Sequence, residues 1–279
     1  IIDRKEQKNR LEQISDDIYS NIQGDLKTLS LFSDSIIKRN DLNADEVAST
    51  LSDSFFPELN TDTVFELNEL ILMGSSGIAD VVYSVKDSVN FSIETKLNEK
   101  NIEKLDLSSR LYFQNVNDTS KSWYSSLVNR YYYLQSIMSY NTGYKEMALS
   151  FSVPPKVFAV TSPVPSLFDH VVPHDAEFAV IDAKGEVLFH SQESKNLHEN
   201  FLNECENHPT LKSAVELRTV EKGRITYNEK PWLFRAVPLE DMPLVLVTLL
   251  DIKQMQKRNT RIILFTFYFF VVTLICILI

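Results

Sequence analysis

The sequence ends in an apolar run, residues 262–279 (IILFTFYFFVVTLICILI), which contains no charged residue, proline or glycine. A helix rises about 1.5 Å per residue, so this run would extend roughly 27 Å, close to the hydrocarbon thickness of a bilayer. A core helix of this length normally shows a polar stripe, and the run has none. It therefore predicts a transmembrane helix, with a fully buried helix as the alternative. The preceding residues would then form a domain tethered to a membrane.

The composition of the whole chain is that of a folded, acidic protein. Hydrophobic residues make up 44% and charged residues 24% of it, which is typical of a globular protein. The formal net charge of −10 disfavours nucleic acid as a partner, because nucleic-acid binding needs a basic surface. Cys276 lies in the apolar run and Cys205 is alone before it, so we expect no internal disulfide. The first residues, without Met or a signal sequence, indicate that another segment precedes them.

Residues 1 to about 40 predict one long helix. Apolar side chains recur at steps of three and four, which is the period of an amphipathic helix. They are Leu11, Ile14, Ile18, Ile22, Leu26, Leu29, Phe32 and Ile36. The helix either packs along a long domain or acts as a stalk between membrane and domain, and both can hold at once. The apolar series also offers a seam for pairing two chains, so we expect a homodimer. Residues 43–56 predict a short second helix.

Residues 61–168 predict an antiparallel sheet with helical insertions. The apolar runs 65–73 and 78–85 flank the turn Gly74-Ser75-Ser76-Gly77, which indicates a β-hairpin. The polar stretch 93–104 is predicted to be helical. Three further strands, rich in β-branched and aromatic residues, are predicted at 131–139, 147–153 and 157–164.

Residues 169–255 repeat this order. The predicted elements are a hairpin at 178–182 and 187–191, a helix at 194–206, and strands at 224–227, 232–238 and 244–250. A hairpin, a helix and three strands, twice in the same order, indicate two tandem α+β modules. The predicted domains are the N-terminal helices (1–60), the first module (61–168), the second module (169–255), and a juxtamembrane linker with the transmembrane helix (256–279). The linker lacks glycine and proline, so helix can continue through it into the membrane.

Two local patterns carry a family resemblance. Residues 178–188 (FAVIDAKGEVL) place Asp182 and Gly185 between two strands, and residues 106–113 (DLSSRLYF) contain a Ser-x-Arg-x-aromatic-aromatic pattern. With the order of long helix, two modules and membrane helix, they resemble the double Cache family of extracytoplasmic sensor domains over nearly the whole chain. The resemblance implies two PAS-like modules, of which the first is distal from the membrane and holds a small ligand.

The resemblance places the ligand site on the second of these patterns. Arg110 matches the arginine of the motif, whose guanidinium suits a carboxylate, and Tyr112 and Phe113 match its aromatic pair. Further candidates for the ligand site lie on the following loop and strand: Trp123, Tyr124, Tyr131 and Tyr133. The alternatives are that the aromatic residues only fill the core and that Arg110 is a surface or capping residue.

The residues around these aromatic side chains bear on the type of ligand. Members of the family that sense amino acids add acidic residues after the aromatic motif, whereas the stretch between Trp123 and Met138 holds no Asp or Glu. A carboxylate without an amine, or a neutral small molecule, is therefore favoured over an α-amino acid.

The sequence predicts no cofactor, metal or catalytic site. It contains no phosphate-binding loop, HExxH, CxxC or nucleophile elbow. His170 and His174 lie four residues apart, but Pro173 between them prevents a shared helical face. Loop histidines are therefore favoured over metal ligands at this place.

The resemblance implies the ligand-sensing domain of a bacterial receptor in the inner (cytoplasmic) membrane, with the folded domain on the periplasmic side. A histidine kinase, chemoreceptor or cyclase output domain would follow residue 279. Basic residues before the apolar run oppose this orientation under the positive-inside rule, although they could instead touch anionic lipid headgroups. They are Lys253, Lys257, Arg258 and Arg261. Two other classes stay open: a membrane-anchored scaffolding module without a small-molecule ligand, and an anchored enzyme, for which no catalytic group stands out.

Overall fold

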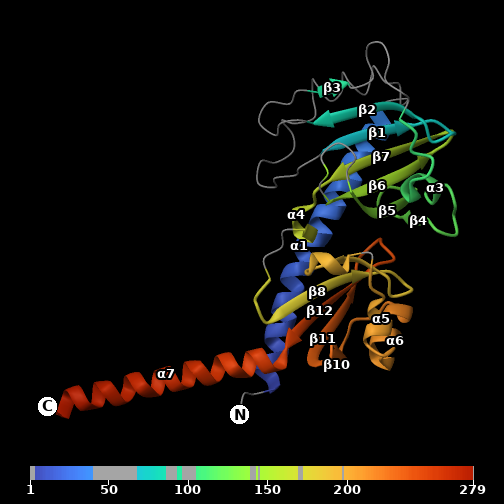
Figure 1. Cartoon of the computed structure of the whole chain (residues 1–279). Helices are drawn as coiled ribbons and strands as arrows, with labels where there is room; N and C mark the ends of the chain where they lie inside the picture. Colours follow the sequence, from blue (N-terminus) through green and yellow to red (C-terminus); the bar gives the residue numbers. More distant parts are fainter. Residues whose placement is uncertain are drawn as a thin grey trace. The chain divides into compact units, whose positions relative to one another are not determined.

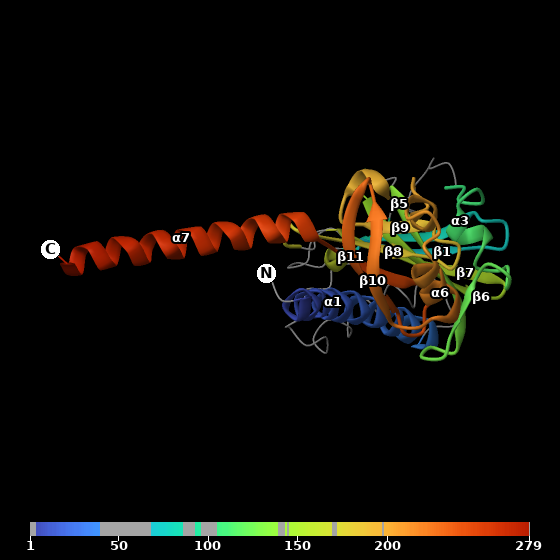
Figure 2. The ribbon, with the colours of Figure 1, turned by 90° about the horizontal axis from the view of Figure 1, so that it is seen from below.

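A computed structural model describes residues 4–39, 68–85, 93–95, 105–138, 143, 145–168, 172–196 and 198–278. The chain divides into two compact units. The seven-stranded unit comprises Asn21–Asp169 and Glu240–Pro243, and the five-stranded unit comprises Ile1–Ser20, His170–Leu239 and Leu244–Ile279. Each combines helices with an antiparallel sheet, so the predicted α+β class is confirmed (Figures 1 and 2). The predicted helix at 43–56 lies outside the described residues.

The long N-terminal helix is confirmed as α1 (Arg4–Arg39). Its apolar series is buried: Leu11 and Ile18 within the five-stranded unit, and the positions from Ile22 to Ile36 within the seven-stranded unit. Burying one such side chain contributes roughly 1.5–3 kcal/mol, so packing rather than propensity stabilises this helix. The same burial contradicts the expected dimer seam, because the series packs inside the chain's own units. The homodimer itself stays a prediction.

Besides the end of α1, the described residues of the seven-stranded unit form one sheet and two short helices. Its elements are β1 (Glu69–Met73), β2 (Ala79–Val85), β3 (Ile93–Thr95), α3 (Leu111–Gln114), β4 (Trp123–Ser125), β5 (Arg130–Met138), β6 (Lys145–Val153), β7 (Lys156–Ser162) and α4 (Pro165–Phe168). The strand order is β3-β2-β1-β7-β6-β5-β4. The first strand thus pairs with both the second and the last, which places residues distant in sequence side by side at the centre of the sheet.

The five-stranded unit repeats this arrangement in smaller form. Its elements are β8 (Ala176–Ile181), β9 (Val187–His190), the 3-10 turn η1 (Glu193–Lys195), α5 (Phe201–Glu204), α6 (Pro209–Leu217), β10 (Glu221–Tyr227), β11 (Lys230–Pro238) and β12 (Val245–Asp251). The order β10-β11-β12-β8-β9 matches the order β5-β6-β7-β1-β2 of the larger sheet. The tandem repetition expected from the sequence is therefore present in the strand topology.

A glycine performs the same task in the first hairpin of each unit. Gly77 and Gly185 have φ values of +80° and +84°, in the left-handed region that favours glycine. A Cβ on Gly77 would lie 2.5 Å from the Ser108 backbone, and one on Gly185 would lie 2.6 Å from the Leu202 side chain. Both hairpins can therefore approach the segment that covers the sheet only because these positions lack a side chain.

Two predictions of secondary structure were wrong in part, and one helix was not predicted. Residues Ile93–Thr95, expected in a helix, form β3 along the edge of β2, as suits two β-branched residues. The helix expected at 194–206 is interrupted, because the Asn196 side chain accepts the His190 N–H (2.6 Å) and Asn200 caps a new helix, α5. The sequence reading also missed α6, whose proline at its first position was an available signal.

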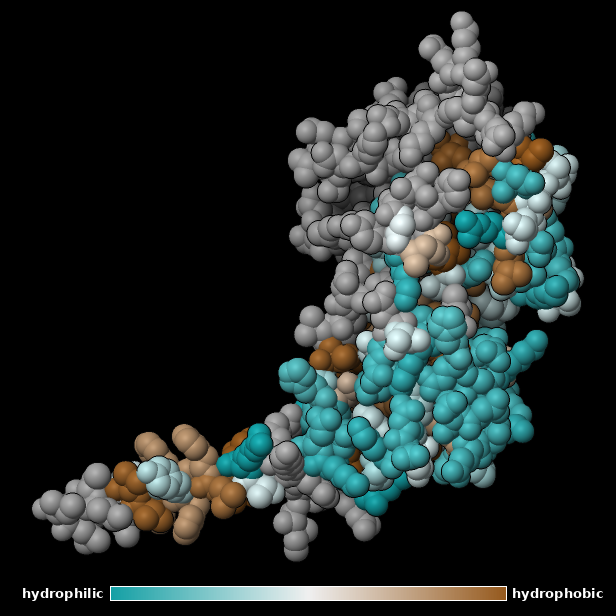
Figure 3. All heavy atoms as spheres, in the orientation of Figure 1, coloured by the Kyte–Doolittle hydropathy of each residue, from teal (hydrophilic) through white to brown (hydrophobic). Residues whose placement is uncertain are grey.

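The C-terminal helix α7 (Ile252–Leu278) begins directly after β12, so the linker before the apolar run is helical as expected. Its described side chains from Ile262 to Phe270 are exposed, and most of them are apolar (Figure 3). Thr266 and Thr273 donate their hydroxyl groups to carbonyls one turn earlier, at 2.9 Å in both cases. Within the residues that the structure describes, no helix is both long enough and apolar enough to cross a membrane.

Candidate functional site

The Ser-x-Arg-x-aromatic-aromatic pattern forms the start of α3 on one face of the seven-stranded sheet. Arg110 is the residue before the first helical turn, in an extended conformation, and is half-buried. Tyr112 is buried, and its backbone is held at both ends: its N–H donates to Gln135 Oε1 (3.0 Å) and its carbonyl accepts from Ser150 Oγ (2.6 Å). The motif is therefore fixed to strands β5 and β6 by side chains of the sheet.

The sheet face beneath α3 is lined by small residues on its central strands. Ala159 of β7 pairs with Ser150 of β6, and Ala148 lies two residues earlier on the same face. Ala148 and Ala159 form one buried cluster with Tyr112, Val116 and residues of β1 and β2. Small side chains at the centre of the sheet allow Tyr112 to pack against it.

The sequence-predicted aromatic residues divide into two groups. Phe113 and Tyr133 pack against the cluster around Tyr112, and Trp123 stacks on Tyr133 with ring centroids 5.7 Å apart. Tyr124 and Tyr131 lie on the β4–β5 hairpin, are 52% and 40% exposed, and contact each other. The structure thus brings Phe113, Trp123 and Tyr133 together with Tyr112, whereas Tyr124 and Tyr131 face solvent.

Four polar residues on the same sheet face were missed at the sequence level. Gln135 and Ser150 anchor α3 as described above. Glu69 of β1 and Glu146 of β6 are buried carboxylates, and Glu146 accepts a hydrogen bond from the Asn68 amide at 2.7 Å. Within each strand, the alternation of side chains between the two sheet faces places these residues on one face. This alternation identifies them as neighbours only when the register between β1, β7, β6 and β5 is known.

The electrostatic surroundings of Tyr112 connect these groups. Burial raises the pKa of Tyr112 to about 12. The positive charge of Arg110 lowers this pKa and the negative charge of Glu69 raises it. Both charged side chains therefore act electrostatically on the Tyr112 hydroxyl group. The site combines one guanidinium, a phenol that stays protonated at neutral pH, and nearby carboxylates.

The five-stranded unit contains a separate polar network on its α5 side. The Tyr227 hydroxyl accepts from Lys195 Nζ (2.6 Å), contacts His190 Nε2 (3.1 Å) and donates to Glu199 Oε2 (3.1 Å). Burial lowers the pKa of His190 to about 3, with a smaller contribution from the Lys195 charge. Burial also raises the pKa values of Glu199 and Tyr227. The network links the buried His190 and Tyr227 to the partly exposed Lys195 and Glu199.

Of the two histidines considered as a metal pair, His170 lies outside the described residues and His174 is an exposed loop residue. Among the residues that the structure describes, no group of three or more His, Cys, Asp or Glu side chains is arranged to hold a metal ion.

No family of known sequences matches the chain, and no curated protein matches it. Solved structures do match. The extracellular domain assigned to the histidine kinase rpHK1S-Z16 has a TM-score of 0.57 at 12% identity, covering 92% of this chain and 99% of that one. The ligand-binding domain of the Pseudomonas fluorescens chemoreceptor CtaA in complex with L-alanine has a TM-score of 0.56 at 14% identity, covering 88% and 96%.

A third similar structure is a domain of a Vibrio parahaemolyticus protein assigned to the sensory box/GGDEF family, with a TM-score of 0.50 at 15% identity, covering 90% of this chain and 97% of that one. At these identities the likeness concerns the fold. The resemblance to double Cache domains is therefore confirmed at the level of the fold: the chain folds like the extracellular ligand-binding domains of histidine kinases and chemoreceptors.

Proposed function

We propose that the chain is the extracytoplasmic ligand-sensing domain of a bacterial transmembrane signalling receptor. The observation that carries the proposal is the placement of Arg110 and Tyr112 on α3, over the small residues of the central strands, in a fold shared with sensor domains. The proposed role of the region itself is ligand binding and not catalysis. The seven-stranded unit corresponds to the membrane-distal module and holds the ligand.

The proposed ligand is a small carboxylate. Arg110 is the cation of the site, and a guanidinium binds a carboxylate through two parallel hydrogen bonds. Phe113, Trp123 and Tyr133 supply the apolar wall that orients a small organic molecule. Tyr124 and Tyr131, which are exposed, form the outer edge of the site. The similar chemoreceptor CtaA was solved with L-alanine, so matched acids with and without an amine are the informative probes.

A thermal-shift screen tests the sensing role. The full chain in detergent micelles is heated with a metabolite library in which each amino acid is paired with the acid that lacks its amine. A ligand at one hundred times its Kd stabilises the folded state by about 2.7 kcal/mol. We expect a shift with an amine-free acid. A preference for the amino acid would refute the proposed ligand class and make Glu69 the candidate partner of an ammonium group.

Membrane attachment is proposed through α7, with the folded units on the periplasmic side of the inner membrane. The support is the run of exposed apolar side chains from Ile262 to Phe270, which would be costly to hydrate. The full chain should stay in the membrane pellet on alkaline extraction, whereas a chain that ends at residue 261 should be released. Release of both would refute the anchor.

Transmission is proposed to run from β12 directly into α7, because Asp251 ends the strand and Ile252 begins the helix. A rigid connection passes on a displacement that a flexible one absorbs. In a receptor that retains its output domain, four glycines inserted after Lys253 should abolish the response while leaving ligand affinity intact. A normal response would refute transmission by this route.

A scaffolding module is the second candidate. It is favoured by the burial of Tyr112, which is only 2% exposed and packs in the core cluster. Such a module would give no thermal shift with any metabolite in the screen and would bind a periplasmic protein through its surface.

A further inference from the structure

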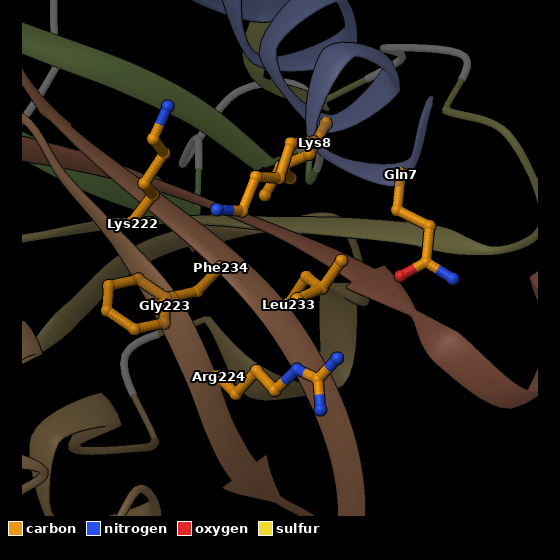
Figure 4. A pocket seen from close by; sticks show the side chains of 8 residues that line it. Gln7, Lys8, Lys222, Gly223, Arg224, Leu233 and Phe234 are labelled. Carbon is orange, nitrogen blue, oxygen red and sulfur yellow. The ribbon is translucent and has the colours of Figure 1, made fainter. Parts of the chain in front are cut away.

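A hollow of about 260 Å³ lies in the five-stranded unit, between the start of α1 and the strands β10 and β11 (Figure 4). We call it the α1 hollow. The residues that line it are Gln7, Lys8, Leu11, Lys222, Gly223, Arg224, Leu233 and Phe234. It is distinct from the site on α3, because all these residues belong to the other unit.

The α1 hollow is basic although the chain is acidic. Three cations line it, Lys8, Lys222 and Arg224, and none of the described residues that line it is acidic. Lys222 forms an ion pair with Glu12 just outside, which lowers the pKa of that carboxyl group. Lys8 and Arg224 are exposed and form no ion pair within the described part of the chain. In a protein with a net charge of −10, this local excess of positive charge favours an anion.

The floor of the α1 hollow is apolar, which narrows the class of anion. Leu11 and Leu233 provide buried aliphatic side chains at the base of the hollow. Gly223 allows the fully buried Phe234 ring to pack closely against β10, because a Cβ there would lie 2.8 Å from the ring edge. The buried Gln7 side chain adds an amide that can donate and accept. A cationic rim over an apolar floor suits an anionic group attached to a short hydrocarbon body, such as an alkyl phosphate or the headgroup region of an anionic lipid.

An occupant would touch the residues that position α7. Leu11 and Leu233 belong to one buried cluster with Ala176 and Leu250. Ile252, the first residue of α7, packs against this cluster. A molecule in the α1 hollow would therefore contact the same packed residues that hold the start of the C-terminal helix.

We infer that the α1 hollow is a second ligand site, which binds an amphipathic anion and through it stabilises the base of α7. Lys8 and Arg224 supply the charge, and Leu11 and Leu233 contact the hydrocarbon. The inference is independent of the site on α3, since it uses other residues in the other unit.

The test measures binding of hexyl phosphate to the full chain by calorimetry, in nanodiscs of phosphatidylcholine. Inorganic phosphate and hexan-1-ol are the matched probes for the anion alone and the hydrocarbon alone. We expect hexyl phosphate to bind more tightly than either. If inorganic phosphate binds as tightly as hexyl phosphate, the apolar floor does not contribute to binding and the proposal is refuted. If hexan-1-ol binds as tightly as hexyl phosphate, the cationic rim does not contribute and the proposal is likewise refuted.

The variants are Lys8→Gln and Arg224→Gln, both at exposed positions that do not threaten folding. Each should weaken hexyl phosphate binding roughly fivefold, since a partly exposed charge-assisted contact is worth about 1 kcal/mol. Arg224→Lys should restore most of the affinity. Lys184→Gln, on the exposed β8–β9 turn of the same unit, is the control and should change nothing. Unchanged affinity in both lining variants, or an equal loss in the control, would overturn the proposal.

The source of the anion is distinguished by the lipid. If a membrane headgroup occupies the α1 hollow, nanodiscs that contain phosphatidylglycerol should weaken the apparent affinity for hexyl phosphate in the wild type but not in Arg224→Gln. If the occupant is a soluble amphiphile, the affinity should be the same in both nanodiscs. Either result supports the site, and failure of hexyl phosphate to bind in phosphatidylcholine nanodiscs refutes it without touching the site on α3.

Discussion

The buried His190 predicts a specific dependence of stability on pH. Its Nδ1 accepts a hydrogen bond from the Gln192 N–H (2.8 Å), so its proton lies on Nε2, directed to the Tyr227 hydroxyl (3.1 Å). A second proton would have to enter at Nδ1, where it would face the Gln192 N–H. Protonation therefore breaks one hydrogen bond and places a charge beside Lys195. The folded protein requires a neutral imidazole.

The magnitude follows from the pKa values. The pKa of His190 is about 3 in the folded protein, against 6.5 for the ordinary group. Because the folded pKa is depressed, the contribution to stability is complete above pH 6.5 and is lost as pH falls toward 3. Each pKa unit corresponds to about 1.4 kcal/mol, so the free energy of unfolding should fall by about 5 kcal/mol across this window.

Other groups titrate in the same window with the opposite sign. Glu177 and Glu199 have raised pKa values because they are buried, so their protonation on acidification favours the folded state. The wild-type curve alone is therefore uninformative, and the His190 contribution is the difference between the wild type and His190→Asn. The asparagine can still accept the Gln192 N–H but cannot take up a proton.

The assay uses the two tryptophans of the chain, one in each unit. In a Trp123→Phe background, Trp232 alone reports urea unfolding of the five-stranded unit, and it packs beside Tyr227. The wild-type minus His190→Asn difference should decrease by up to about 1.4 kcal/mol per pH unit between the two pKa values. The substitution His198→Asn, at an exposed position of the same unit, is the matched control. A flat difference curve for His190→Asn would refute the requirement for a neutral imidazole.

Two further predictions concern the packing of each unit. Tyr132→Phe removes the hydrogen bond from the tyrosine hydroxyl to the Asp241 carbonyl (2.6 Å) and should lower the free energy of unfolding of the seven-stranded unit by about 1 kcal/mol. The measurement is Trp123 fluorescence during urea unfolding in a Trp232→Phe background. An unchanged free energy would show that the segment around Asp241 is held by other contacts. Gly185→Ala should lower the free energy of unfolding by at least about 2 kcal/mol, because it adds a collision with Leu202 to the backbone strain. Gly143 has a φ of +70° and no atom within 4 Å of its Cβ position, so Gly143→Ala should lower the free energy of unfolding by about 1 kcal/mol from strain alone. Equal costs would refute the role of the collision.

The sequence allowed prediction of those elements whose signals are local. The three-four spacing of α1 and the glycine turns at Gly77 and Gly185 fixed a long helix and two hairpins, and the repeated order of elements indicated two modules. Residues 93–95 were misread because a polar, β-branched segment can form either an edge strand or a helix, and pairing with β2 decides which. The helix at 194–206 was misread because side-chain bonds from Asn196 and Asn200 compete with continued helix.

The candidate site was predictable only where a contiguous motif carries it. Arg110, Tyr112 and Phe113 are neighbours in the sequence, and the structure keeps them together on α3. Gln135 and Ser150 were not predictable as anchors of Tyr112, because they lie on different strands and meet only through the pairing of β5 with β6. The burial of the apolar series of α1 likewise depends on both sheets, which is why the helix was predicted correctly and its availability for dimerisation was not.

The central claim, that the seven-stranded unit binds a small carboxylate through Arg110, is tested most directly by calorimetric titration of the best acid from the screen. Arg110→Gln should reduce affinity by roughly ten- to a hundredfold, because a charge-assisted hydrogen-bonded pair is worth about 1.5–3 kcal/mol. Arg110→Lys should recover part of the loss, and the exposed Lys121→Gln should bind like the wild type. Affinity unchanged in Arg110→Gln, with the acid still bound, would contradict the account.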